Sequence, residues 1–314
     1  MPHRVRELAS RLSFRQLQVF ASVYQLRSYS RAGEQLGLTQ PAVSSQIRQI
    51  EQALGQPVFE YLGRRLFVTA AGERLAASVE VIFDQLRLLQ DDLAALQGQV
   101  AGELKLLAVS TAQYVVPYLL QDFLRACPQV TVSVRVVNRS LAIQRLSDNS
   151  DDLVVMGIVP QGKPFASLPF LDNELLPVVA AGHALAGQSQ VAAQAFLDAG
   201  LLLREPGSGS RLALELHCQQ QRLRLQPQMV LGSNEAVKHA VLAGLGVAVL
   251  PRLSIAAELA LGSLQRLAID GFPLRRSWCL VHPQARQPTP VMRAFIDYVR
   301  GNIAAFADRF QASD

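Results

Sequence analysis

Residues 39–55, TQPAVSSQIRQIEQALG, decide the fold of the N-terminal region. Thr39 followed by Pro41 predicts the first turn of a helix, where the missing N–H of proline costs no hydrogen bond. The apolar residues of this segment recur at spacings of four, three and four, so they share one buried face; they are Val43, Ile47, Ile50 and Leu54. The opposite face carries Gln40, Ser44, Ser45 and Arg48, and Gly55 ends the helix.

Two shorter helices are predicted before this one. Ser13 is a typical N-cap for a helix with apolar residues at 14, 17, 20, 23 and 24. Ser30, with Glu34 following, predicts the start of a short helix that ends near Gly37. Two short helices joined by a tight turn, the second with a polar face, indicate a helix-turn-helix.

A basic hairpin is predicted directly after the third helix. Residues 57–62 and 66–69 favour β-strands, and Gly63, Arg64 and Arg65 form the turn between them. Such a wing can place its arginines on a phosphate backbone or in a minor groove.

The net charge of +5 is concentrated in this region. Residues 1–70 contain nine arginines and four glutamates, whereas the remaining 244 residues contain 21 basic and 21 acidic side chains. A basic domain on a neutral body is typical of nucleic-acid binding, because glutamine and arginine can pair with base edges and serine can hold phosphate. Charge and polarity alone leave open a merely solvated surface.

The segments 14–20, 30–36, 39–47 and 63–69 resemble the DNA-binding domain of LysR-type transcriptional regulators. The resemblance implies a winged helix-turn-helix that binds double-stranded promoter DNA. The DNA-binding residues that we then expect are Ser30, Arg31, Gln40, Pro41, Ser44, Ser45, Arg48, Arg64, Arg65 and Thr69.

A long helix is predicted between the DNA-binding domain and the rest of the chain. Its apolar residues recur at alternating spacings of four and three, and they are Leu75, Val79, Ile82, Leu86, Leu89, Leu93 and Leu96. This heptad pattern favours pairing with a second helix and hence a dimer, although one amphipathic helix packed on its own domain is the alternative. In the resembled family the linker helix dimerises the protein, and the resemblance further implies a homotetramer.

The C-terminal two-thirds of the chain alternates strands and helices. After a hinge at residues 98–102, the order strand, helix, strand, helix, strand predicts an α/β lobe with a parallel sheet covered on both faces. A second α/β set follows, and the chain returns through residues 278–282 to a terminal helix over residues 291–306. Two lobes joined by two crossovers indicate a cleft, as in periplasmic solute-binding proteins, and the resemblance implies the same fold.

Polar side chains gather at the strand-to-helix junctions, where ligands of such sheets bind. Hydroxyl groups, glycines and nearby cations suit an anion. The alternative is that each serine or asparagine only caps its helix. The effector-binding residues that we expect are Ser110, Thr111, Ala112, Asn138, Arg139, Gly157, Ile158, Arg204, Pro206, Gly207, Ser208, Ser233 and Asn234.

The sensor half resembles the Calvin-cycle (CbbR/RbcR-like) regulators within the family. The matching segments are residues 109–112, 138–139, 148–149, 156–157, 204–209 and 233–238. That subgroup is thought to sense phosphorylated sugars or reduced nicotinamide dinucleotide phosphate. Gln113 stands where a lysine is common and Ile158 where an arginine is common, so two positive charges near the expected pocket are missing.

Other classes of protein fit the sequence less well. The five histidines show no metal-ligand spacing and no pairing with a nucleophile, so neither a catalytic site, a metal nor a cofactor is predicted. Cys127, Cys218 and Cys279 are scattered, and Asp151 and Asp152 are interpreted as a solvated turn. A transport-type binding protein is disfavoured because no signal peptide or membrane span is recognised, so a cytoplasmic location without membrane association is expected.

The domain boundaries follow from these patterns. We expect a DNA-binding domain at 1–70, a dimerisation helix at 71–97, a hinge at 98–102 and an effector-binding domain at 103–314. Lobe I then covers about 103–178 and 281–314, and lobe II covers about 179–280. The hypothesis is a regulator of an interrupted palindromic site, modulated by a small anionic effector of unknown identity that changes DNA bending and recruitment of RNA polymerase.

Overall fold

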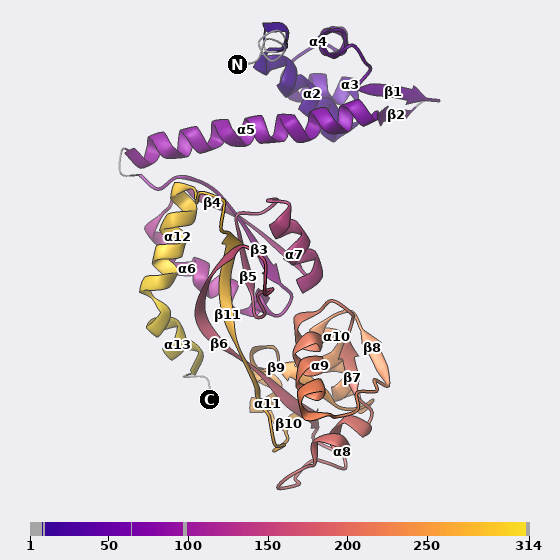
Figure 1. The fold of residues 1–314 in the computed structure, drawn as a ribbon, viewed down its shortest axis with the longest axis vertical. Coiled ribbons are helices and arrows are strands. Elements are labelled where there is room, and N and C mark those ends of the chain that lie inside the picture. Colours follow the sequence, from indigo (N-terminus) through magenta and orange to yellow (C-terminus); the bar gives the residue numbers. More distant parts are fainter. Residues whose placement is uncertain (1–7, 9, 64, 97–98, 312–314) are drawn as a thin grey trace. The chain divides into compact units, whose positions relative to one another are not determined.

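The computed structural model describes residues 8, 10–63, 65–96 and 99–311. The chain divides into two compact units, residues 1–90 and 91–314 (Figure 1). Each unit has its own hydrophobic core.

Three helices and a hairpin form the body of the first unit. In chain order the elements are α2 (Phe14–Leu26), α3 (Tyr29–Leu36), α4 (Gln40–Leu54), β1 (Phe59–Leu62), β2 (Arg65–Val68) and the long α5 (Ala70–Leu96). The predicted cap at Ser13 and the predicted helix start at Thr39 are confirmed, because each side chain accepts a hydrogen bond from the first turn of its helix. Gly55 ends α4 in the left-handed conformation, at a φ of 72°.

The start of α3 differs from the prediction. Ser28, not Ser30, is the N-cap: its backbone is extended and its Oγ accepts a hydrogen bond from the Arg31 N–H at 3.3 Å. Ser30 already lies inside the first turn of the helix, where its backbone is helical and cannot serve as a cap.

The core of this unit joins the predicted apolar face of α4 to α2 and the hairpin. Val43, Ile47 and Ile50 are fully or almost fully buried, and the ring centroid of Phe20 lies 5.3 Å from that of Phe59. Gly33 lets α3 and α4 approach closely, because a Cβ atom there would lie 2.6 Å from the Leu38 carbonyl oxygen.

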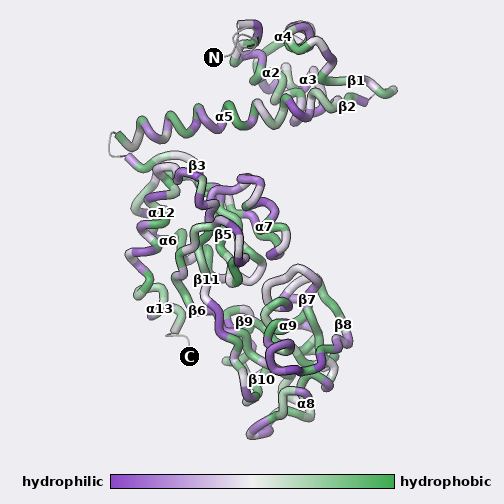
Figure 2. Tube along the Cα trace, in the orientation of Figure 1, coloured by the Kyte–Doolittle hydropathy of each residue, from purple (hydrophilic) through white to green (hydrophobic). Residues whose placement is uncertain are grey.

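Helix α5 buries only the beginning of its heptad pattern. Leu75 and Val79 pack on the core of the first unit, whereas the later heptad residues are exposed, from 37% at Ile82 to 84% at Leu96. Figure 2 shows hydrophobic and hydrophilic residues alternating along this helix. An unpaired chain therefore leaves an apolar stripe in water.

Lobe I is formed by the N-terminal and C-terminal parts of the second unit. Its elements are β3 (Gly102–Val109), η1 (Ala112–Tyr114), α6 (Val116–Ala126), β4 (Val130–Val137), α7 (Arg139–Ser147), β5 (Leu153–Met156), α12 (Pro290–Gly301) and α13 (Ile303–Gln311). Strand β3 pairs in parallel with both β4 and β5.

Lobe II contains shorter elements. They are α8 (Ala193–Asp198), β7 (Leu202–Arg204), α9 (Gly209–Gln221), β8 (Met229–Leu231), α10 (Asn234–Leu242), β9 (Ala248–Pro251), η2 (Arg252–Ser254), α11 (Ala256–Ala260) and β10 (Leu264–Arg266). Strands β7 and β8 form a separate parallel pair.

Two long strands, β6 (Phe165–Ala180) and β11 (Leu274–Pro283), run through both lobes (Figure 1). They pair with each other antiparallel, from Leu274 opposite Leu175 to Pro283 opposite Phe165. Leu171 and Trp278 belong to the core of lobe I, whereas Leu175 and Leu274 belong to a core of lobe II. The chain thus crosses between the lobes within a few residues on each strand.

The structure corrects three details of the predicted second unit. The main sheet, in the order β10-β6-β11-β5-β3-β4, is mixed rather than parallel, because both crossover strands run antiparallel to their neighbours. The predicted terminal helix is broken at Asn302 into α12 and α13. Asp151 and Asp152 are buried rather than solvated, because Arg145 and Arg286 form ion pairs with them.

The close approach at Gly33 gives a testable prediction. Gly33→Ala adds a methyl group against a backbone oxygen, so we expect the free energy of opening of α3 and α4 to fall by about 1–3 kcal/mol. Amide hydrogen exchange of residues 29–54 measures this change.

The control is Gly301→Ala, at a helical position where a Cβ atom meets nothing within 4 Å. Alanine there gains helix propensity of up to about 1 kcal/mol, so protection of α12 should be unchanged or higher. Equal protection of α3 in the Gly33→Ala variant and the wild type would contradict the close contact.

Candidate functional sites

The polar face of α4 forms the first candidate site, a surface of the first unit. Gln40, Pro41, Ser45 and Arg48 are exposed, and Ser44 is half-buried. The Gln40 Nε2 donates a hydrogen bond to the Ser44 Oγ at 3.1 Å, which aligns the two side chains on one turn. The face offers amide, hydroxyl and guanidinium groups without a carboxylate among these residues, which suits base edges and phosphates.

Other predicted DNA-binding residues lie on neighbouring elements of the same unit. Ser30 and Arg31 are exposed on α3, and Arg65 is exposed at the first position of β2. Arg64 lies outside the described residues. Arg15 was not predicted, but its guanidinium donates a hydrogen bond to the Leu36 carbonyl at the end of α3, at 3.2 Å.

Thr69 has a structural role within its own unit. Its hydroxyl donates to the Pro57 carbonyl at 2.7 Å and accepts a hydrogen bond from the Gly72 N–H at 3.1 Å. The hydroxyl therefore ties the hairpin to the first turn of α5, where an unpaired N–H group would otherwise remain.

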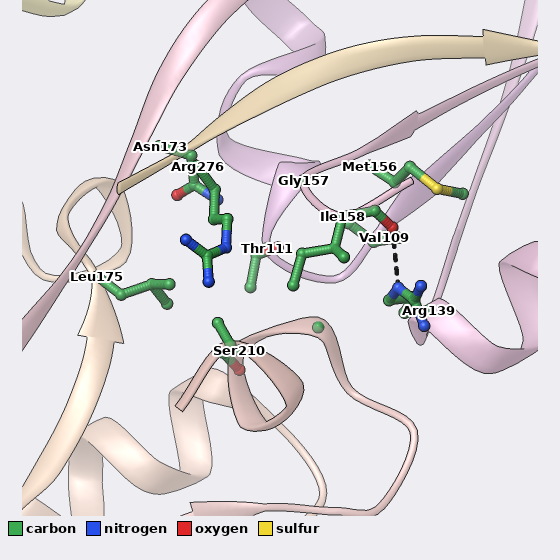
Figure 3. Close-up of a pocket in the computed structure, with 12 residues that line it drawn as sticks. Val109, Thr111, Arg139, Met156, Gly157, Ile158, Asn173, Leu175, Ser210 and Arg276 are labelled. Carbon is green, nitrogen blue, oxygen red and sulfur yellow. Dashed lines mark hydrogen bonds between the residues drawn. The ribbon is translucent and has the colours of Figure 1, made fainter. Parts of the chain in front are cut away.

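The second candidate site is a cavity between the lobes of the second unit (Figure 3). Lobe I, lobe II and both crossover strands contribute to its lining, which consists of Val109, Thr111, Arg139, Met156, Gly157, Ile158, Asn173, Leu175, Gly209, Ser210, Ala213 and Arg276. Gly157 packs closely here, because a Cβ atom would lie 3.0 Å from the Asn173 Nδ2.

The structure brings only some of the predicted effector residues to this cavity. Thr111, Arg139, Gly157 and Ile158 line it. Asn138, Ser208 and Ser233 cap helices α7, α9 and α10, each accepting a hydrogen bond from a backbone N–H. Of the other predicted residues, Ala112 is buried in η1, and Pro206 and Gly207 lie in the loop before α9.

Arg204 is buried in a polar network beside the cavity, with 4% of its surface exposed. Glu205 pairs with it through both carboxylate oxygens, at 2.7 Å and 3.0 Å. The same guanidinium donates to the Asn234 Oδ1 at 2.5 Å and to the Ser110 Oγ of lobe I at 3.2 Å. The charge of Arg204 is therefore neutralised by Glu205, and the Asn234 Nδ2 is left buried without a partner.

A second contact between the lobes joins Tyr114 to Glu235. The Tyr114 hydroxyl donates to the Glu235 Oε1 at 2.5 Å, and the Lys238 Nζ lies 2.9 Å from the Glu235 Oε2. Burial opposes ionisation of Glu235, but the hydrogen bonds from Tyr114 and Lys238 outweigh it and lower the pKa of this carboxyl group. Burial, together with the hydrogen bond to Glu235, raises the pKa of Tyr114.

Two guanidinium groups reach the cavity itself. Arg139 donates its Nε–H to the Ile158 carbonyl oxygen at 2.9 Å, and burial lowers its pKa. Arg276 on β11 extends into the cavity, and it was not predicted from the sequence. No local motif marks it, because its position follows from the pairing of β11 with β6.

Two classes of site find no support in the described residues. Within them no cluster of three or more histidine, cysteine, aspartate or glutamate side chains is placed to hold a metal ion. The helices in the described ranges are all too short or too polar to cross a membrane.

Comparison with known families finds a matching family model for each of the two units. The family model described as "Bacterial regulatory helix-turn-helix protein, lysR family" matches residues 14–73. The model described as "LysR substrate binding domain" matches residues 97–304. Together they cover both units of the structure.

Individual relatives agree with this assignment. A RuBisCO operon transcriptional regulator of Acidithiobacillus ferrooxidans is 40% identical over 293 residues, which is 93% of this chain and 94% of that protein. The regulatory domain of CcmR from Synechocystis PCC6803, solved in complex with 2-PG, is 34% identical and covers 63% of this chain and 96% of its own, at a TM-score of 0.60. Full-length CbnR, solved with its target DNA, shares the fold at 21% identity and a TM-score of 0.70, over 92% of this chain and 99% of its own.

The contact between Tyr114 and Glu235 gives a prediction for stability. Tyr114→Phe removes one hydrogen bond between the lobes, so the free energy of unfolding of the second unit should fall by about 1 kcal/mol at pH 7. The effect stays small because 46% of the Glu235 side chain is exposed to solvent. Urea unfolding followed by the fluorescence of Trp278, the single tryptophan, measures it.

The pH dependence has a definite sign. Because the pKa of Glu235 is lowered on folding, its stabilising effect is present above the ordinary value of 4.5 and is lost as the pH falls through the folded pKa. The difference between Tyr114→Phe and the wild type should therefore shrink below pH 4.5. Tyr118→Phe is the control, and an equal loss in both variants would argue against the specific contact.

Proposed function

This chain belongs to the family of LysR-type transcriptional regulators, and we propose that it binds an interrupted palindromic promoter site under the control of a small anionic metabolite. The observation that carries the DNA-binding part is the polar face of α4. Gln40, Ser45 and Arg48 are exposed on one side of this helix, while Val43, Ile47 and Ile50 are buried on the other. Residues 1–70, which include this face, carry the whole excess of positive charge.

In the proposed complex, α4 enters the major groove. Gln40 and Arg48 contact base edges, and Ser44 and Ser45 contact phosphates near the start of the helix. Arg65 and Arg64 of the hairpin anchor the wing on the DNA backbone or in the minor groove. The DNA-binding domain then comprises residues 1–70, as expected from the sequence.

The exposed stripe on α5 supports a dimer. Five apolar side chains between Ile82 and Leu96 are exposed in the single chain, and a second copy of the helix would cover them at heptad spacing. A two-fold dimer presents two α4 helices, which is why the proposed operator has two half-sites. We propose that two dimers assemble into a tetramer that contacts RNA polymerase at the promoter.

The cavity between the lobes supports an anionic effector. It receives the guanidinium groups of Arg139 and Arg276, and the described residues place no carboxylate in its lining. The 2-PG complex of the CcmR regulatory domain supports the effector domain as a ligand-binding unit. Ligand binding would change the contacts between the lobes at Tyr114 and Arg204, and through them the arrangement of the assembly on DNA.

The DNA-binding proposal is tested by Arg48→Ala. Loss of a base contact of this kind costs about 1–3 kcal/mol, so we expect specific affinity to fall about tenfold to a hundredfold. Fluorescence anisotropy with the DNA upstream of the protein's own gene, across a salt series, measures the change.

Arg125→Ala is the matched control, because it removes the same charge from an exposed site on α6 in the second unit. Its affinity should stay within a factor of two of the wild type. Equal affinity of the wild type for specific and scrambled DNA would contradict sequence-specific binding.

The dimer proposal is tested on α5. Leu89→Glu places a charge in the exposed apolar stripe, so the dimer dissociation constant should rise at least tenfold, about 1.4 kcal/mol. Sedimentation equilibrium measures it, with Gln85→Glu as a control on the same helix outside the heptad positions. A dimer that is unaffected by Leu89→Glu would show that another surface holds the chains together.

A further inference from the structure

The cavity between the lobes offers fewer free positive charges for an anion than the arginines near it in the sequence suggest. Ile158 lines it with an apolar side chain. Arg204, the nearby buried cation, is already paired with both oxygens of Glu205. An anion in the cavity must therefore find its positive charge elsewhere.

Arg139 supplies only part of that charge. Its Nε–H is bound to the Ile158 carbonyl oxygen at 2.9 Å, which holds the guanidinium at one wall of the cavity (Figure 3). Burial already makes the charged form of Arg139 less favourable, because the group has lost part of its hydration.

Arg276 is the better placed cation. Figure 3 shows its guanidinium extending into the middle of the cavity, between Leu175 and Thr111. One of its N–H groups donates to the Arg275 carbonyl oxygen at 2.7 Å, and no ion pair with a carboxylate is found for it among the described residues. The charge of Arg276 also affects His217. Burial of the imidazole is the larger cause, and the charge of Arg276 the smaller cause, that lower the pKa of His217.

The position of Arg276 on β11 links the cavity to the crossover. Arg276 lies directly opposite Asn173 of β6, and both residues line the cavity. This pair lies between Leu171 and Trp278, in the core of lobe I, and Leu175 and Leu274, in a core of lobe II. An anion bound to Arg276 would therefore be held at the point where the lobes are joined.

We propose that Arg276 is the principal anion-binding side chain of the cleft. The inference rests on the proposed effector function of the cavity. Thr111 and Ser210, both more than nine-tenths buried, provide hydroxyl groups at the same site, and the Ser210 Oγ has no hydrogen-bond partner. Ile158 and Leu175 contact the carbon part of the ligand.

The experiment is a calorimetric titration of the full-length protein with 2-PG and, separately, with inorganic phosphate. The wild type should bind one 2-PG per chain. Arg276→Gln should weaken this binding at least tenfold, and Arg276→Lys should restore part of it, because lysine keeps the charge without the planar fork.

Arg275→Gln is the matched control on the neighbouring residue. Arg275 is exposed and pairs with Glu174, so its loss should change the affinity for 2-PG less than twofold. Equal weakening by Arg275→Gln and Arg276→Gln would overturn the assignment. Failure of the wild type to bind either 2-PG or phosphate would overturn it as well.

A DNA-binding measurement distinguishes failure of this inference from failure of the proposed function. The affinity of the ligand-free protein for its upstream DNA should be the same in the wild type, Arg276→Gln and Arg275→Gln. If that affinity is intact while 2-PG and phosphate fail to bind, the anion assignment is wrong and the DNA-binding proposal stands. If specific DNA binding is absent in all three, the proposed function fails independently of Arg276.

Discussion

The effector-binding unit depends on one constraint: within residues 99–311 the chain passes between its lobes only through β6 and β11, a pair of antiparallel strands. Any movement between the lobes must bend or twist this pair, because the two cores on either side are separately packed. The other contacts between the lobes include polar ones, through Tyr114 with Glu235 and Arg204 with Ser110, and the packing of Ile158 of lobe I against a core of lobe II. Polar contacts of this kind can be exchanged for contacts with a ligand at little net cost, whereas a packed core cannot.

The distribution of charge follows from the same arrangement. Arg204 is the most deeply buried arginine of the cleft, and Glu205 neutralises it because an unpaired buried cation would be strongly destabilising. Arg276 lies on the crossover strands, where solvent reaches it, and so needs no carboxylate partner. The structural cation and the cation available to a ligand are therefore different residues, which sequence motifs alone do not distinguish.

Local signals were sufficient to predict most of the first unit. Caps and glycine stops act through neighbouring residues, so Ser13, Thr39 and Gly55 could be assigned from the sequence, although Ser28 rather than Ser30 caps α3. Features that depend on distant residues were missed. The burial of Asp152 depends on Arg286, far along the chain, and the cavity position of Arg276 depends on the register between β6 and β11. Three of the nine predicted effector residues outside the cavity, Asn138, Ser208 and Ser233, are helix caps, because the same small polar residues serve both purposes.

The central claim is that paired copies of this chain place two α4 helices on one promoter site. Hydroxyl-radical footprinting of the full-length protein on the DNA upstream of its own gene tests it most directly. The account predicts two protected segments on the same face of the duplex, with centres separated by a whole number of turns of about 10.5 base pairs. A single protected segment, or uniform protection without boundaries, would contradict it.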